Sequence, residues 1–438
     1  MREGDVTLGA LRGVRAGVRV SVTAAIEHPV TLTQVLAADA VPLAELQRRY
    51  GALLALVRTL IGVVPNCDPY LEIWPAAFRS YNVMVPNLLN LPLMLWGAGA
   101  PKQPVALAMW TSSRAAACMY CSAHTCSFAL RRGVPGEKVV DRDACTEADR
   151  AAIAAAEGLG RVPATFTDTQ RRALLRAMKA GDAEWVLLSI AMMGFLNKMM
   201  DMLGVELEAA TVGEVGALIE PTGWSTGKHR VVPTIGAAPP AHGDSLALKV
   251  GLLRHLPAAL AFDRRWTRGV PGREPAVGEY LRAHTGHDFP VLRHLTHARA
   301  VRAIATMLRE NCSPAESVLG LELKHQAGLV YATVVGDPDL AADIRALARA
   351  HDGGGLDAAR DFAAAPLDGD DPAAVERAAS AHGPALLLAK AASPSPARIS
   401  PAIVERSREL PRAAVVELAS WLSVLQLLHR INVFYAAA

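Results

Sequence analysis

The chain has few aromatic residues and no sustained alternation of apolar and polar residues. Aromatic residues make up 5% of its 438 residues, whereas 51% are hydrophobic and alanine is abundant. Strands and β-sandwiches depend on β-branched and aromatic residues in a two-residue period, so these absences argue against them. Packing through Ala and Leu is typical of helices. We therefore predict an all-α fold.

Strong charge and long apolar runs are also absent. The formal net charge is +3 and no run of five or more basic residues occurs, so we expect no nucleic-acid partner. Arg2, Arg12, Arg15 and Arg19 precede no apolar segment long enough for a signal peptide. The most apolar stretch, 185–195, is about half the length of a membrane span. We expect a cytoplasmic protein with no membrane partner.

The chain has only six cysteines, but Cys118 and Cys121 form a CxxC motif that is followed by His124. On one helix these three residues would lie on a single arc of about 120°. We expect that helix to include residues 112–132 and to stop at Gly133. His124 could take the proton of Cys121, and the resulting thiolate is the nucleophile. The second thiol could then capture the oxidised sulfur as a disulfide.

Two other interpretations of the cysteines remain open. Isolated ones such as Cys67, Cys145 and Cys312 are commonly small buried hydrophobes, and the CxxC pair could be the same. Alternatively, the three residues of the motif could bind zinc together with Cys126. On a helical wheel, however, Cys126 falls some 140° from Cys121, and one helix cannot wrap all four ligands around a tetrahedral ion. We predict neither a metal nor a cofactor.

The length of the chain and a weak internal repeat suggest two units. Residues 178–199 and 410–431 both begin with a polar turn, continue as apolar helical segments and end in a polar and basic pair. Between them lies a stretch rich in Pro and Gly. We predict a first domain over 1–212, a linker over 213–246 and a second, duplicated domain over 247–438.

Aligning the two copies places the segment 319–325 opposite 118–124. The second copy would then keep a histidine, His325, and carry Glu322 in place of the second thiol. A glutamate and a histidine three residues apart could bind a metal or exchange protons, although such pairs are more often solvated helix neighbours. A rival register places Cys312 opposite Cys118. In either register the second copy has lost the dithiol.

The first half resembles the carboxymuconolactone decarboxylase and alkylhydroperoxidase D (AhpD) superfamily. The resemblance is carried by the segment 85–92, by the CxxC motif with its histidine and Gly133, and by the segment 196–205. It implies two AhpD-like helical bundles in tandem, forming a pseudo-dimer with a degenerate second copy. Proteins of this superfamily normally work as oligomers, so a homo-oligomer is a candidate assembly.

The resemblance also implies roles for residues. It makes Cys121 the nucleophile, Cys118 the resolving thiol and His124 the base. Two departures stand out: only two residues separate Cys121 from His124 instead of three, and Ala106 occupies the position of the relay glutamate. We therefore hypothesise that the second half lends a carboxylate to His124, from the set Glu310, Glu316 and Glu322.

These observations predict a thiol-dependent oxidoreductase. It would act on a small-molecule substrate, as a peroxidase or in dithiol/disulfide exchange, with a thiol reductant protein as a candidate partner. A decarboxylase or lyase that uses His124 in acid/base chemistry is the alternative. A third hypothesis is a non-catalytic scaffold in which the dithiol is vestigial.

Overall fold

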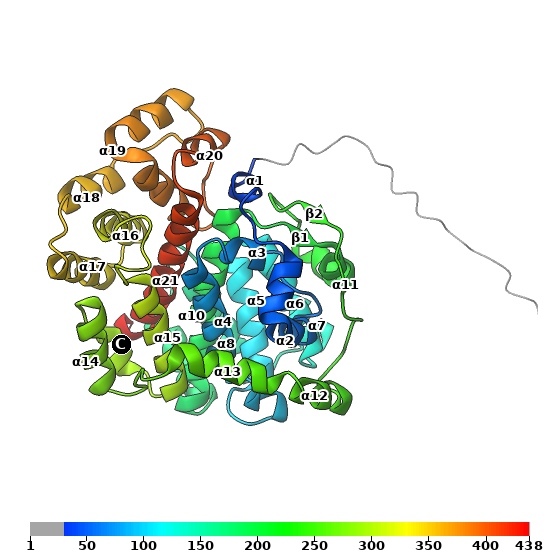
Figure 1. Cartoon of the computed structure of the whole chain (residues 1–438). Helices are drawn as coiled ribbons and strands as arrows, with labels where there is room; N and C mark the ends of the chain where they lie inside the picture. The colour runs from blue at the N-terminus through cyan, green and yellow to red at the C-terminus, as the bar shows by residue number, and fades with distance from the viewer. Residues whose placement is uncertain (1–29, 438) are drawn as a thin grey trace, which may run out of the picture.

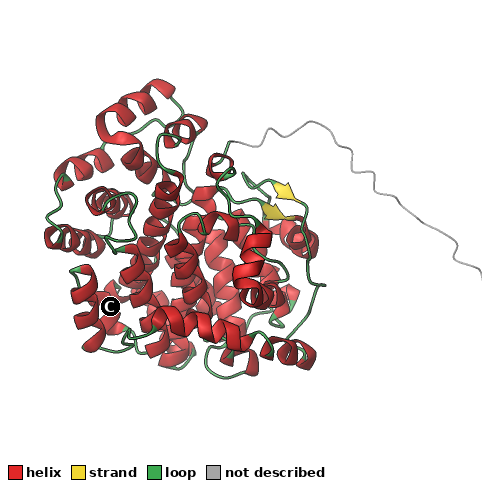
Figure 2. Ribbon diagram, viewed as in Figure 1, coloured by secondary structure: helices red, strands yellow, loops and turns green. Residues whose placement is uncertain are grey.

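The computed structural model describes residues 30–437, apart from the side chain of Ala247. Helices account for 68% of it and strands for 1%, which confirms the all-α prediction (Figures 1 and 2). The N-terminal arginines and the first part of the predicted domain 1–212 lie outside the described residues.

The first half of the chain folds into helices joined mostly by short turns. They are α1 (Leu32–Leu36), α2 (Leu43–Ile61), α3 (Asp68–Leu71), α4 (Pro75–Leu88), the 3₁₀ helix η1 (Leu93–Trp96), α5 (Lys102–Ala115), α6 (Met119–Arg131), α7 (Gly136–Val140), α8 (Glu147–Gly160), α9 (Asp168–Ala177) and α10 (Ala180–Leu203). Capping boxes fix the starts of α8 and α9, where Thr146 and Thr167 accept from backbone N–H groups three residues on.

The segment between the halves packs back on the first half. It comprises β1 (Leu207–Glu208), α11 (Ala209–Ile219), η2 (Glu220–Thr222) and β2 (Val231–Val232), and the two short strands pair in parallel. Asp244, farther along, forms ion pairs with Lys102 and Arg132. The breaker-rich predicted linker is therefore held against the first half by buried charge.

The second half is also helical. It contains α12 (Leu246–Leu253), α13 (Leu256–Thr267), α14 (Ala276–Thr285), η3 (Pro290–His294), α15 (Ala298–Asn311), α16 (Leu321–Val335), α17 (Pro338–Ala350), α18 (Leu356–Ala364), α19 (Pro372–Ala392), α20 (Pro401–Ser407) and α21 (Arg412–Ala436). The predicted duplication, and with it the pseudo-dimer, remains a prediction.

The two longest helices, α10 and α21, pack against one another at the centre (Figure 1). By length and composition each could cross a membrane, but 94% and 100% of their most apolar windows are buried inside the protein. Core helices have the same composition because they are apolar on every face. One apolar cluster extends across both halves.

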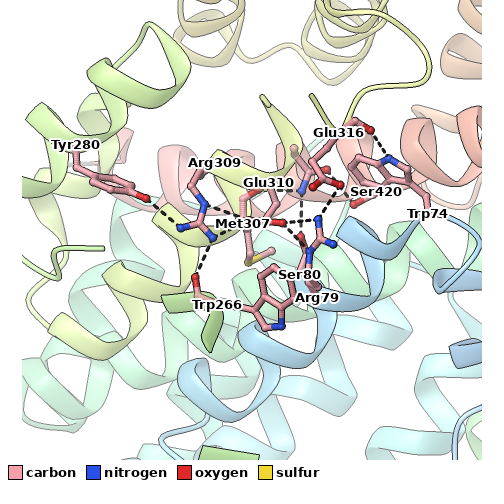
Figure 3. Close-up of polar contacts among 11 residues, drawn as sticks. Trp74, Arg79, Ser80, Trp266, Tyr280, Met307, Arg309, Glu310, Glu316 and Ser420 are labelled. Atoms are coloured by element: carbon pink, nitrogen blue, oxygen red, sulfur yellow. Dashed lines mark hydrogen bonds and ion pairs between the residues drawn. The ribbon is translucent and has the colours of Figure 1, made fainter. Parts of the chain in front are cut away.

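Buried polar contacts also join the halves. Figure 3 shows Arg79 of α4 between Glu310 and Glu316, at 2.7 and 2.8 Å, and the indole of Trp74 donating to the Glu316 carbonyl. The Lys198 ammonium of α10 donates to three consecutive carbonyls of residues 392–394. The cysteine helix α6 is thus part of a core to which both halves contribute.

Candidate active site

The helix that carries the CxxC motif begins at the motif itself. α5 ends at Ala115 and α6 starts at Met119, so the prediction of one continuous helix over 112–132 is wrong. Ala117 adopts a left-handed conformation (φ 53°). No Gly or Pro at this point in the sequence would have predicted the break. Cys118 becomes the N-cap, and its Sγ accepts from the backbone N–H of Cys121 at 3.4 Å. The positive end of the helix dipole therefore lies at the two thiols.

Cys121 and His124 line a partly open cavity of ≈ 100 Å³. The rest of its wall is mostly apolar and includes four methionines, a side chain that adapts to irregular ligands: Met109, Met192, Met193 and Met200. Cys118 is fully buried and does not line the cavity. Of the two thiols in the motif, only that of Cys121 is therefore placed to meet a ligand.

A buried carboxylate holds His124. Nε2 of His124 lies 2.7 Å from Oε2 of Glu208, on β1, and the other carboxylate oxygen accepts from the Tyr120 hydroxyl and the Asn66 backbone N–H. Burial alone would raise the pKa of Glu208, but His124 and the hydrogen bonds outweigh it and hold that pKa below its ordinary value. Glu208 is thus ionised at neutral pH.

An ionised Glu208 fixes the tautomer of the imidazole. Nε2 of His124 must carry the hydrogen that points at the carboxylate, which leaves the lone pair on Nδ1. Nδ1 is buried and has no hydrogen-bond partner among residues 30–437. His124 is therefore arranged as a proton acceptor at the wall of the cavity.

The Cys121 thiol needs such a base. Burial, and then the neighbouring Cys118 sulfur, raise its pKa well above the ordinary value, so the thiol is protonated at neutral pH. A compensating positive charge comes from the second half. Arg430 of α21 is fully buried, and burial lowers its pKa to about 10, while Tyr331 and the charges of Cys121 and Cys118 act to raise it. The attraction is mutual, so the guanidinium favours a thiolate on Cys121.

Arg430 is held by groups of the first half. It donates to the Ser112 hydroxyl at 2.6 Å, to the Ile190 carbonyl at 2.7 Å and to the Gly160 carbonyl. Its Nε makes no hydrogen bond to any described residue. The second half thus contributes a cation to this site, and sequence reasoning did not identify it.

The sequence also did not predict two groups in the wall of the cavity, or the buried carboxyl next to one of them in the chain. Cys67 and Tyr81 line it, although Cys67 was expected to be an inert buried cysteine. Asp68 is buried, and burial, Glu208 and Glu72 together raise its pKa to about 8, so that it holds a proton at neutral pH. No periodicity or spacing in the sequence pairs residues 67–81 with α6.

The second-copy pair is not assembled into a comparable site. Glu322 is exposed and accepts from the Gly354 backbone N–H at 3.2 Å. His325 is buried and stacks on His351 with ring centroids 5.6 Å apart. No described hydrogen bond or ion pair joins Glu322 to His325. The two residues lie on the same helix, but Glu322 faces solvent and His325 is buried.

The hypothesis of a carboxylate lent by the second half is wrong. The partner of His124 is Glu208, within the first half. Glu310 and Glu316 are bound to Arg79 (Figure 3), and Glu322 faces solvent. Among residues 30–437, no group of three or more His, Cys, Asp or Glu side chains is arranged to hold a metal ion.

Comparison with known proteins identifies no family. The chain matches no protein-family model and no curated protein. Two solved structures are similar over 41% of this chain, both at 20% identity: the debrominase Bmp8 without ligand (TM-score 0.37, 96% of that chain) and its Cys-to-Ala variant in complex with 2,3,4-tribromopyrrole (TM-score 0.36, 95% of that chain).

Proposed function

We propose that this protein is a thiol-dependent oxidoreductase acting on a small molecule, in which Cys121 is the nucleophile, Cys118 the resolving thiol and His124 the base. One observation carries the proposal. Cys121 and His124 line the same cavity, and the Glu208 contact at 2.7 Å leaves the imidazole lone pair on the nitrogen that has no other partner. A redox-neutral enzyme would not need the second thiol.

A hydroperoxide substrate illustrates the chemistry. Nδ1 of His124 takes the thiol proton, and the Cys121 sulfur attacks the terminal peroxide oxygen, forming an S–O bond as the O–O bond breaks. The proton passes to the departing alkoxide, giving an alcohol and a sulfenic acid on Cys121. The Cys118 sulfur then displaces that hydroxyl as water and forms the disulfide, and an external dithiol protein returns two electrons.

The short link between the sulfurs supports the second step. Cys118 is the N-cap of α6, and from that position its Sγ accepts a hydrogen bond from the backbone N–H of Cys121. A bond between the sulfurs needs side-chain movement within one helical turn only.

Quantitative alkylation and peptide mass spectrometry test the proposal on the full chain. After one equivalent of a small hydroperoxide, we expect a Cys118–Cys121 disulfide that a dithiol reductant reverses. In Cys118→Ser, the oxidation should stop at a sulfenic acid or a mixed disulfide on Cys121, and His124→Ala should raise the pH at which that thiol reacts. The matched control Cys126→Ser alters a buried thiol on the same helix that does not line the cavity.

A different result would favour the alternative. If both thiols remain reduced under oxidants that cycle other protein dithiols, the redox function is wrong. If Cys118→Ser then retained full turnover of a lactone or a β-keto acid while His124→Ala lost it, the site would perform acid/base chemistry alone.

A further inference from the structure

A second apolar cavity adjoins the first. It has a volume of ≈ 70 Å³ and lies between α2, α4, α12 and α13. The two cavities share four aliphatic side chains in their walls: Val57, Leu60, Val85 and Leu91. A single layer of aliphatic side chains therefore separates the second cavity from the one that contains Cys121. Such side chains can change rotamer without breaking a hydrogen bond.

The second cavity also has polar groups in its wall. Arg299, Asp263 and Lys249 line it, and Arg299 donates to Asn87, which in turn donates to Asp263 at 2.6 Å. The Lys249 ammonium lies 5.2 Å from the centroid of the Trp96 ring. The lining is therefore mostly aliphatic, with a few polar groups, one of which, Lys249, lies next to the half-exposed Trp96.

Exposed apolar side chains lie on two of the elements that line the second cavity. We call this set the entry patch, and it lies on η1 and α12: Leu93 (50% exposed), Trp96 (49%), Leu246 (72%), Val250 (55%) and Leu253 (49%). Trp96 and Leu253 belong to both the patch and the cavity wall. In Figure 1, α12 lies at the edge of the molecule, away from the contact of α10 with α21. Contiguous exposed apolar surface commonly marks a place where apolar ligands arrive.

We propose that the second cavity receives the unbranched aliphatic chain of an amphipathic substrate whose reactive end reaches Cys121. The chain would enter over the entry patch and displace the shared side chains into one continuous slot. The assignment of the reactive end rests on the proposed function, whereas the site for the chain does not. A cavity of ≈ 100 Å³ alone would hold only a group about as large as a small ring, and joining the two spaces extends it along one direction.

Chain-length dependence is the measurable consequence. Each methylene moved from water into an apolar compartment should tighten binding about fourfold until the compartment is full. Isothermal titration calorimetry with straight-chain primary alcohols, from butanol to decanol, measures this on the full protein. The heat-capacity change of binding should become more negative along the series.

Two substitutions on one helix localise the chain. Ala259 of α13 lines the second cavity, whereas its neighbour Ala258 is exposed and does not. We expect Ala259→Trp to reduce the affinity for decanol at least tenfold and to leave that for butanol unchanged. Ala258→Trp should change neither. Leu256→Phe, a smaller intrusion into the same cavity, serves as a second variant if Ala259→Trp does not fold.

The inference is overturned if affinity in the unmodified protein does not depend on chain length. It is also overturned if Ala259→Trp, or Leu256→Phe in its place, binds decanol as well as Ala258→Trp does. Failure of the proposed function looks different, because the dithiol would then fail to cycle while the chain-length dependence persisted.

Discussion

Helices α6 and α16, which the predicted duplication would align, each carry a buried histidine. His124 has a carboxylate 2.7 Å from Nε2 and lines a cavity with a thiol, whereas His325 stacks on another imidazole. Burial, with the charges of His351 and Lys324, lowers the pKa of His325 to about 4, so it is neutral at physiological pH. A buried histidine becomes a candidate base only when a second group fixes its tautomer and a space lets a substrate reach it.

Two buried carboxylates, Glu208 in the first half and Glu417 in the second, have different partners. In the second half, Glu417 forms an ion pair with Lys324 and accepts from the backbone N–H groups of Val318 and Leu319 at 2.7 and 2.8 Å. Those contacts hold the loop before α16, and none of the residues involved lines the cavity that contains Cys121. Glu208 instead accepts a hydrogen bond from the imidazole of His124, whose other ring nitrogen has no partner among the described residues. His429 of the second half also pairs with a carboxylate, Asp337 at 2.8 Å, and its Nε2 has no partner among the described residues, but it does not line the cavity that contains Cys121.

The largest effect should come from the thiol that lines the cavity. We expect Cys121→Ser to reduce turnover roughly a thousandfold or more, because a serine hydroxyl is a far weaker nucleophile and cannot form the disulfide. Steady-state rates with a small hydroperoxide would measure it. Cys312→Ser, in the second half, should retain the full rate. If both variants lost the same fraction of the turnover rate, the proposal that the chemistry resides in the first half would be wrong.

Next in size is a stability effect confined to the second half. Glu417→Gln leaves the buried Lys324 ammonium without its counter-charge, and breaking such a pair costs about 3–5 kcal/mol. Urea unfolding should show this loss. The rate per folded molecule should not change, and a fall in that rate at full folding would show that the second half takes part in the chemistry through Glu417.

Replacing the carboxylate beside His124 should have a smaller effect on rate. We expect Glu208→Gln to slow turnover roughly a hundredfold, because an amide can donate as well as accept and so no longer requires the imidazole hydrogen to lie on Nε2. Because the pKa of Glu208 is depressed by folding, its contribution to stability is present at neutral pH and is lost as pH falls through that pKa. Glu208→Gln should therefore lose less stability on acidification than the unmodified protein. Glu322→Gln is the matched change on α16 and should alter neither quantity.

The smallest effect concerns His325 and appears only in acid. Its folded pKa of about 4 lies below the ordinary 6.5, so the unfolded chain binds a proton first and stability falls as pH drops from 6.5 toward 4. His325→Gln should flatten that part of the stability profile and leave the turnover rate intact. Thermal unfolding at pH 7 and pH 5 tests it. A profile as steep as that of the unmodified protein would assign the acid sensitivity to other groups.

Part of the site could be predicted because it depends on local geometry. Helical periodicity placed Cys121 and His124 on one face, and both line the cavity, while Cys126 on another face does not. The break at Ala117 could not be predicted, because a left-handed alanine has no sequence signal comparable to Gly. The Cys118 sulfur consequently caps the helix and does not lie along it.

The sequence by itself determined that the chain is helical, where its apolar helices run and which residues follow each other around α6. These are properties of composition and of a 3.6-residue period, which act over a few residues. Only the tertiary structure decided that Glu208, 84 residues away, meets His124 and that Arg430 reaches Ser112 across 318 residues. Such contacts depend on how helices pack, and each buried charge is tolerated only where distant groups happen to satisfy it. The same packing left two apolar spaces beside Cys121, a property that no single helix encodes.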